Sequence, residues 1–234
     1  MALGKNEIRL VCRVRAMIPV KQGPEPWDFD QRVRQPGLAV LRAAGIAPTA
    51  ITSRAQLYRA CTSGKPEYWR RVRAELRAAF QGCCAYSCFL LEESTTPGGA
   101  ELSANVDHFK PISKVRVSLA YEWTNLRWAW KTIDHDYKKN KSIALDPCSI
   151  TICPFSLDVG NFGLLVPVSG LSQAQQNDAE QALDVLGLNR KSCEVVRSSW
   201  ANDFIENANL YGDMLMQRWQ PFLWQELKQL GAIP

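Results

Sequence analysis

The sequence is poor in histidine and has no long apolar run. Only two of its 234 residues are histidine, so any chemistry that needs an imidazole depends on those two positions. No uninterrupted apolar segment approaches the roughly 20 residues that a membrane-spanning helix needs. Residues 1–15 also lack the apolar core of a signal peptide. We therefore expect no membrane partner and a cytoplasmic location.

The chain also lacks internal repeats, low-complexity segments and a glycine-rich loop of the kind that cradles phosphates. Any dependence on ATP must therefore come from another protein. A hydrophobic content of 46% and a charged content of 22% are ordinary for a folded protein. We predict a single domain over residues 1–234.

Positive charge is concentrated in the N-terminal third. Residues 1–80 hold 15 Lys and Arg against six Asp and Glu, whereas residues 81–234 hold 13 against 17. A basic region of this kind favours a polyanionic partner. Arginine-rich helices are also common as plain solvated surfaces, and that alternative stays open.

Helical and strand patterns alternate along the chain. Residues 8–14 alternate apolar and basic side chains, which predicts a half-buried strand. Apolar spacing together with proline, glycine and capping residues predicts the other elements. These are helices at residues 36–44, 53–61, 66–80, 179–186 and 193–230, the last broken at Pro221, and a strand at 162–168.

Both histidines fall in one stretch, residues 105–141, which reads NVDHFKPISKVRVSLAYEWTNLRWAWKTIDHDYKKNK. Asp107 and His108 lie together at the end of a short extended run. Asn125 follows in the segment EWTNL, and the segment IDHD (133–136) comes soon after it. Carboxylate, imidazole and amide groups at this density predict the active site.

This order of residues resembles the HNH nucleases, whose site is a β-hairpin closed by a helix around one divalent metal. The segments DHFKPIS, YEWTNL and YKKNK, with CAYSC just upstream, all occur in family order. The resemblance implies an α+β fold, predominantly α-helical, with a ββα-metal (HNH) core at about residues 80–145. A basic strand and helices (1–80) would precede this core, and a helical region (170–234) would follow it.

The resemblance also implies roles for individual residues. His108 would be the general base, and Asp107 would bind Mg²⁺ or Mn²⁺ through oxygen. Asn125 would tie the loop down and orient the imidazole. The third metal position falls on Asp134, where many relatives have Asn or His, and a one-residue shift would put His135 there instead. With Asp134 as the ligand, His135 would face the phosphate or the leaving group as a catalytic residue.

Many HNH proteins carry a four-cysteine zinc knuckle around this centre. The two cysteines of CAYSC match its first pair, whereas Trp130 and Ile133 stand where the second pair would fall. Two interpretations stay open, of which we favour the second. Both interpretations concern Cys84, Cys88, Cys148 and Cys153. In the first, these cysteines form a structural zinc site, and in the second they are buried free thiols that pack as small hydrophobic groups.

Basic residues on both sides of the Asp-His pair are the predicted nucleic-acid contacts. They are Arg70, Arg71, Arg73, Arg77, Lys110, Lys138, Lys139 and Lys141.

The segment LGLNR (186–190), followed by a long helix, is similar to bacterial HNH proteins of anti-phage defence. These include the nuclease component of Septu-type and some retron systems, and the likeness covers about residues 80–200. It implies a DNA endonuclease, with RNA not excluded, that works with a partner ATPase. The alternative is an HNH-fold subunit that binds nucleic acid or acts as a scaffold without catalysis, since the third ligand is altered and the cysteine framework is partial.

Overall fold

The computed structural model of the chain describes residues 22–62, 66–91, 102–151 and 153–234. The described residues are mostly helical and contain two separate antiparallel strand pairs, β1–β2 and β3–β4. This confirms an α+β fold rich in helix. The elements, with η for 3₁₀ and π segments, are η1 (Asp30–Arg34), α1 (Gln35–Ala43), α2 (Arg54–Ala60), η2 (Tyr68–Val72), α3 (Arg73–Ala79), β1 (Ala104–His108), η3 (Ile112–Lys114), η4 (Val117–Tyr121), η5 (Trp123–Asn125), β2 (Leu126–Trp130), η6 (Ile133–Lys138), β3 (Phe155–Asp158), β4 (Asn161–Pro167), α4 (Gln173–Val185), α5 (Lys191–Trp219) and α6 (Pro221–Gln229).

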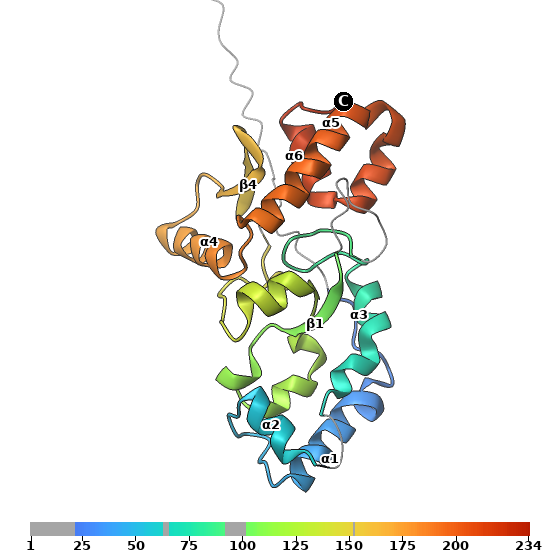
Figure 1. Cartoon of the computed structure of the whole chain (residues 1–234), viewed down its shortest axis with the longest axis vertical. Coiled ribbons are helices and arrows are strands. Elements are labelled where there is room, and N and C mark those ends of the chain that lie inside the picture. Colours follow the sequence, from blue (N-terminus) through green and yellow to red (C-terminus); the bar gives the residue numbers. More distant parts are fainter. Residues whose placement is uncertain (1–21, 63–65, 92–101, 152) are drawn as a thin grey trace, which may run out of the picture.

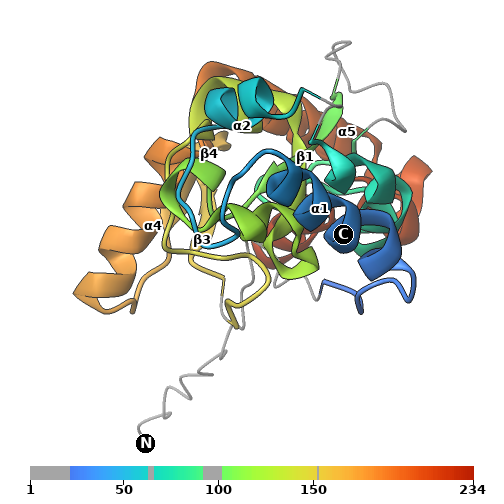
Figure 2. The ribbon, with the colours of Figure 1, turned by 90° about the horizontal axis from the view of Figure 1, so that it is seen from below.

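The described residues form an elongated molecule (Figure 1). Helices α1 and α2 lie at one end, α3 and β1 lie nearer the middle, and α5 and α6 lie at the opposite end. Helix α4 projects from one side of the molecule, both in this view and from below (Figure 2). None of the helices in the described ranges is long and apolar enough to cross a membrane.

The N-terminal helices form where the sequence predicts them. Helix α1 carries Pro36 in its first turn, where a proline needs no hydrogen-bond donor. Helix α2 begins after Ser53, whose side chain and that of Gln56 each bond the other's backbone N–H group. The third predicted helix consists of η2 followed by α3. Its predicted apolar stripe is buried and comprises Trp69, Val72, Leu76 and Phe80.

The C-terminal half packs helices on the β3–β4 pair. Strand β4 confirms the predicted strand, and β3, which the sequence analysis missed, pairs with it. Helix α5 packs against β4 and against α6. The backbone of α5 leaves helical geometry at Asn207 and Gly212, and Pro221 separates α5 from α6 as predicted.

One cluster of buried side chains links both halves and runs from Phe29 to Ile233. The arginine Arg127 lies within it, only 1% exposed, and donates to both carboxylate oxygens of Asp146 at 2.7 Å. This paired charge ties β2 to the segment after η6. The strand predicted at residues 8–14 lies outside the described residues.

Gly187 joins the C-terminal half to the helical segment η6. Its φ angle is +62°, and a Cβ atom there would overlap the ring of Tyr137 in η6. The Tyr137 hydroxyl in turn shares a hydrogen bond of 2.5 Å with Ser192 Oγ at the start of α5. A glycine is therefore needed at this position both for its backbone angle and for the close approach of the ring.

The substitution Gly187→Ala is expected to lower the free energy of unfolding more than Gly45→Ala does. Both residues have positive φ angles, +62° and +67°, but Gly45 has no atom within 4 Å of the added Cβ. Both variants incur the cost of a left-handed backbone, and only Gly187→Ala adds about 1–3 kcal/mol of overpacking. Urea unfolding of the two variants measures the difference. Equal losses would mean that the Tyr137 ring does not limit the space at Gly187.

Candidate active site

The antiparallel pair β1–β2 positions the predicted Asp-His pair. Asp107 lies opposite Arg127 and His108 opposite Leu126 at the end of β1. The segment η6, which carries Asp134, follows β2 and packs against it. The chain thus brings groups from both ends of the stretch 105–141 together.

The Asp107 side chain is buried and fully engaged by two donors. It is 3% exposed and accepts hydrogen bonds from the Tyr86 hydroxyl at 2.5 Å and from Lys138 Nζ at 3.0 Å. Lys138 Nζ also donates to the carbonyl oxygen of His108 at 2.7 Å. Burial alone would raise the pKa of Asp107, but the Lys138 ammonium and the hydrogen bonds hold that pKa below its usual value. Asp107 is therefore a fixed, negatively charged group.

The substitution Lys138→Met is expected to destabilise the protein by about 3–5 kcal/mol, because it leaves the buried Asp107 carboxylate without its cation. Urea unfolding would measure the loss. The double variant Lys138→Met/Asp107→Asn should recover most of it, and Lys139→Met, at an exposed neighbour, should change stability by no more than about 0.5 kcal/mol. A small effect of Lys138→Met, equal to that of Lys139→Met, would contradict the ion pair.

Asp134 lies against Asp107. Its side chain is 12% exposed, and Asn105 Nδ2 donates to its Oδ2 at 2.5 Å. Burial, followed by the negative charge of Asp107 and a hydrogen bond to it, raises the pKa of Asp134 to about 8. Two carboxyl groups in contact that share one proton are a site where a cation can replace the proton.

This pair of carboxylates fits one hard divalent cation. Mg²⁺ is commonly held by one or two carboxylates, with water and substrate phosphate completing its shell. Among the described residues there is no group of three or more His, Cys, Asp or Glu that could hold a metal ion. A divalent ion held by these two carboxylates alone would keep positions open for water and substrate. The Lys138 ammonium beside Asp107 would weaken the affinity for a cation.

The imidazole of His108 is held in one tautomer. Its ring packs edge-on against Trp69, with 4.7 Å between ring centroids, and Nε2 lies 3.2 Å from the carbonyl oxygen of Ala120. Because a carbonyl oxygen can only accept, Nε2 is assigned the proton and Nδ1 keeps its lone pair. Burial lowers the pKa of His108 to about 4, so the ring is neutral at pH 7. Among the described residues no hydrogen bond engages Nδ1.

Asn125 closes the loop between β1 and β2. Its Oδ1 accepts from the backbone N–H of Lys110 at 2.8 Å, and its Nδ2 donates to the carbonyl oxygens of Lys110 and Leu119 at 3.1 Å. Leu119 precedes Ala120, the partner of the His108 ring. Asn125 therefore acts on the imidazole through the loop that it fixes.

Asn105 is a site residue that the sequence analysis missed. Besides its bond to Asp134, its Nδ2 lies 2.9 Å from His135 Nε2. Asn105 stands two residues before Asp107 on β1, so the two side chains point to the same side of the strand. The two-residue spacing between Asn105 and Asp107 in a predicted strand was the sequence signal that could have identified Asn105 as a site residue.

His135 lies at the mouth of the site. Its side chain is 45% exposed, and Nε2 is 3.3 Å from Asp134 Oδ2. The structure thus turns Asp134 toward Asp107 and leaves His135 nearer to solvent. Of the two residues, Asp134 is therefore the one whose side chain lies with that of Asp107.

The structure corrects the prediction that Lys138 contacts nucleic acid. Its side chain is 0% exposed and ion-paired with Asp107, because residues four apart share a face of a helical segment and Asp134 already points inward. The other three predicted lysines are exposed at Lys110, Lys139 and Lys141.

The four predicted arginines differ in exposure and in the groups that they contact. Arg73 is half-buried, donates to the carbonyl oxygen of Ala104 at 3.3 Å and stacks over Trp128. Arg71 is exposed and stacks over Tyr68. The remaining two are Arg70, which is exposed, and Arg77, which is half-buried.

The four cysteines proposed for zinc do not gather into a metal site within the described ranges. Cys84 is buried, and its sulfur accepts from the backbone N–H groups of Tyr86, Ser87 and Trp130 at 3.3–3.5 Å. Burial raises the pKa of Cys148 to about 11 and also raises that of Cys84. These thiols are therefore protonated at pH 7. These backbone hydrogen bonds to Cys84 hold the CAYSC segment against β2.

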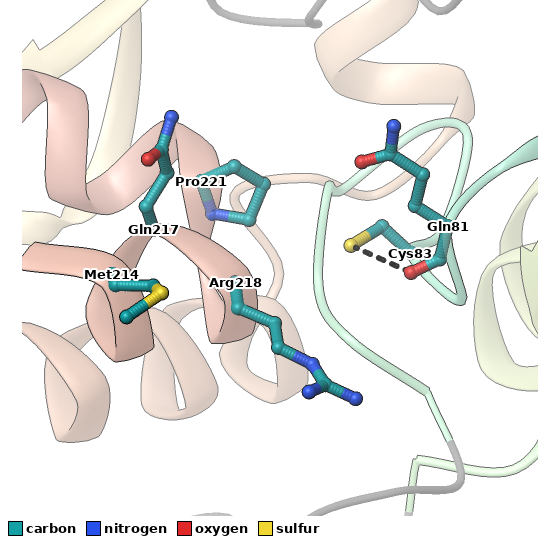
Figure 3. A pocket seen from close by; sticks show the side chains of 6 residues that line it. All are labelled: Gln81, Cys83, Met214, Gln217, Arg218 and Pro221. Carbon is teal, nitrogen blue, oxygen red and sulfur yellow. Dashed lines mark hydrogen bonds between the residues drawn. The ribbon is translucent and has the colours of Figure 1, made fainter.

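A hollow of about 360 Å³ lies away from these residues, between the loop after α3 and the end of α5 (Figure 3). Cys83 lies on one side of it and donates to the carbonyl oxygen of Gln81, while Arg218 lies on the other. Burial raises the pKa of the Cys83 thiol to about 12. Among the described residues no carboxylate or imidazole lines this hollow, and we assign no chemistry to it.

In comparisons with known proteins, no family model and no curated sequence matches this chain. Assignment to the HNH nucleases therefore stays a proposal that is based on the motifs and on the geometry of the site.

Proposed function

We propose that the chain is a metal-dependent endonuclease of the HNH type that hydrolyses phosphodiester bonds of DNA. The observation that carries the proposal is one constellation at the end of β1. It comprises a pair of interacting carboxyl groups, at Asp107 and Asp134, and the neutral imidazole of His108, the next residue along β1. In this proposal, β1, β2 and η6 form the ββα-metal core.

His108 supplies the base in the proposed reaction. Its Nδ1 accepts a proton from the attacking water, while the Ala120 carbonyl holds Nε2–H and steadies the imidazolium that forms. The negative charge of the neighbouring Asp107 favours that protonated state. Trp69 limits movement of the ring through its edge-on contact.

Asp107 and Asp134 would hold a Mg²⁺ or Mn²⁺ ion, which when bound would stabilise charge on the scissile phosphate and on the leaving oxygen. Tyr86 and Lys138 fix the Asp107 carboxylate, and Asn105 fixes that of Asp134. In this proposal His135, whose side chain is 45% exposed, contacts the phosphate or the leaving group.

A second candidate function is a subunit that binds nucleic acid or acts as a scaffold without cleaving. The buried Lys138 ammonium favours it, because this group already compensates the charge of Asp107. Incubation of the purified chain with duplex DNA, single-stranded DNA and RNA, each with Mg²⁺, Mn²⁺ or EDTA, separates the two candidates. We expect cleavage of DNA in either metal and none in EDTA. Binding without cleavage in every condition would support the subunit.

The wider role that we propose is anti-phage defence together with a separate ATPase. The similarity of the LGLNR segment to defence nucleases supports this role. The structure places this segment in the core, with Leu186 and Leu188 buried. Co-purification of an ATPase with the tagged chain, and loss of protection against phage in a His108→Ala strain, would be the expected results.

A further inference from the structure

Two arginines from different elements converge on one carboxylate near the site. Arg54 at the start of α2 and Arg70 in η2 each place NH2 on Glu67 Oε1, at 3.0 and 2.9 Å. The Glu67 side chain is 10% exposed, whereas those of Arg54 and Arg70 are 49% and 54% exposed. One carboxylate thus anchors two guanidinium groups, and the trio carries a net charge of +1 that faces solvent.

This trio is held on the segment that contacts the His108 imidazole. Arg70 follows Trp69, the residue whose ring contacts His108. The segment η2, which carries Arg70, also packs against η4, and η4 contains Ala120, the partner of the His108 ring. Arg70, and Arg54 through Glu67, are therefore held on the segment that packs against the His108 side of the site.

The neighbouring arginines are used differently. Arg71 lies over Tyr68 and donates to the carbonyl oxygen of Arg32 at 3.2 Å, and Arg73 is held against β1 and β2. A guanidinium has five N–H donors. Glu67 takes only part of those on Arg54 and Arg70, and Arg54 also donates to the Tyr58 hydroxyl at 3.3 Å and lies over the Tyr58 ring. Exposed, pre-positioned guanidinium groups of this kind suit phosphate oxygens.

We propose that Arg54 and Arg70, anchored by Glu67, form a phosphate clamp that binds the nucleic-acid backbone next to the scissile bond. The clamp deepens the proposed nuclease function and rests on it. Of the four arginines predicted to contact nucleic acid, the clamp keeps only Arg70, and it adds Arg54, which was not among them.

The test compares two double variants that remove the same charge. Arg54→Gln/Arg70→Gln removes the clamp, and Arg42→Gln/Arg59→Gln removes two exposed arginines of α1 and α2. Fluorescence anisotropy with a labelled DNA duplex in EDTA gives the dissociation constant over a range of NaCl concentrations without cleavage. Each lost phosphate contact should flatten the plot of log K against log salt by about 0.9. We expect a slope shallower by about one to two units for the clamp variant, and a wild-type slope for the control.

Equal slopes in the two double variants would overturn the clamp. A lower melting temperature of the clamp variant with an unchanged slope would likewise reduce the trio to a structural ion pair. The single variant Arg70→Gln keeps the Arg54–Glu67 pair and serves as the test if the double variant does not fold. We expect its slope of log K against log salt to be shallower than that of the wild type by about one unit. Because binding is measured in EDTA, failure of the clamp is distinguished from failure of the nuclease, which shows only as absence of cleavage with metal. Duplex RNA as a second probe tells whether the clamp prefers one backbone.

Discussion

Replacing His108 with alanine is expected to lower the rate of phosphodiester cleavage by about 10²- to 10⁴-fold, the usual loss when a general base is removed. The reason is local. The Ala120 carbonyl occupies Nε2, so Nδ1 is the basic atom of the ring, and the low pKa keeps it unprotonated at pH 7. Single-turnover cleavage of a short duplex at saturating Mg²⁺ measures the chemical step directly.

The His108→Ala variant needs two controls because its ring also packs against Trp69. Circular dichroism and thermal melting should show a folded protein, and duplex binding in EDTA should match the wild type. Cleavage at the wild-type rate by a folded His108→Ala protein would remove the base assignment and, with it, the proposed mechanism.

Replacing Asp134 with alanine is expected to raise the Mg²⁺ concentration needed for half-maximal activity by at least about 10-fold, the scale of loss seen even for groups that only support a ligand. Asp134 contacts Asp107 and would share the ion with it, and excess Mn²⁺ should restore part of the activity. Metal titrations of the initial cleavage rate measure the shift.

The adjacent variant His135→Ala is the matched comparison. His135 is exposed at the mouth of the site, so its loss should lower the rate at saturating metal and leave the metal requirement unchanged. The opposite pattern would move the metal ligand by one residue to His135. If neither variant changes activity or metal dependence, the carboxylate pair is not the cation site.

Most helices could be predicted because their caps and apolar stripes are formed by residues close together in the sequence. The Ser53 cap and the buried stripe of η2 and α3 depend on residues close in sequence, so spacing alone located them. Strand β3 was missed because its pairing with β4 and its burial under α6 are contacts between segments distant in sequence. The order Asp-His-Asn-Asp pointed to residues that the fold does bring together, since both histidines and both carboxylates lie around one hairpin.

The errors concern side chains whose surroundings are set by packing. Lys138 belongs to a basic run that looks uniformly exposed in the sequence, yet one turn of η6 directs it inward to Asp107. Arg73 similarly lies over Trp128 instead of facing solvent. The spacing of cysteines could not decide between zinc and free thiols. Backbone hydrogen bonds to Cys84 become visible only in the folded chain.

The most direct test that this site is a nuclease centre is the nicking of supercoiled plasmid DNA by the purified chain. Wild type and Asp107→Ala are compared side by side, with Mg²⁺ and with EDTA, after melting curves show that both are folded. We expect nicked and then linear plasmid only for the wild type in Mg²⁺. Equal cleavage by Asp107→Ala, or by the wild type in EDTA, would contradict a metal-dependent centre at Asp107, Asp134 and His108.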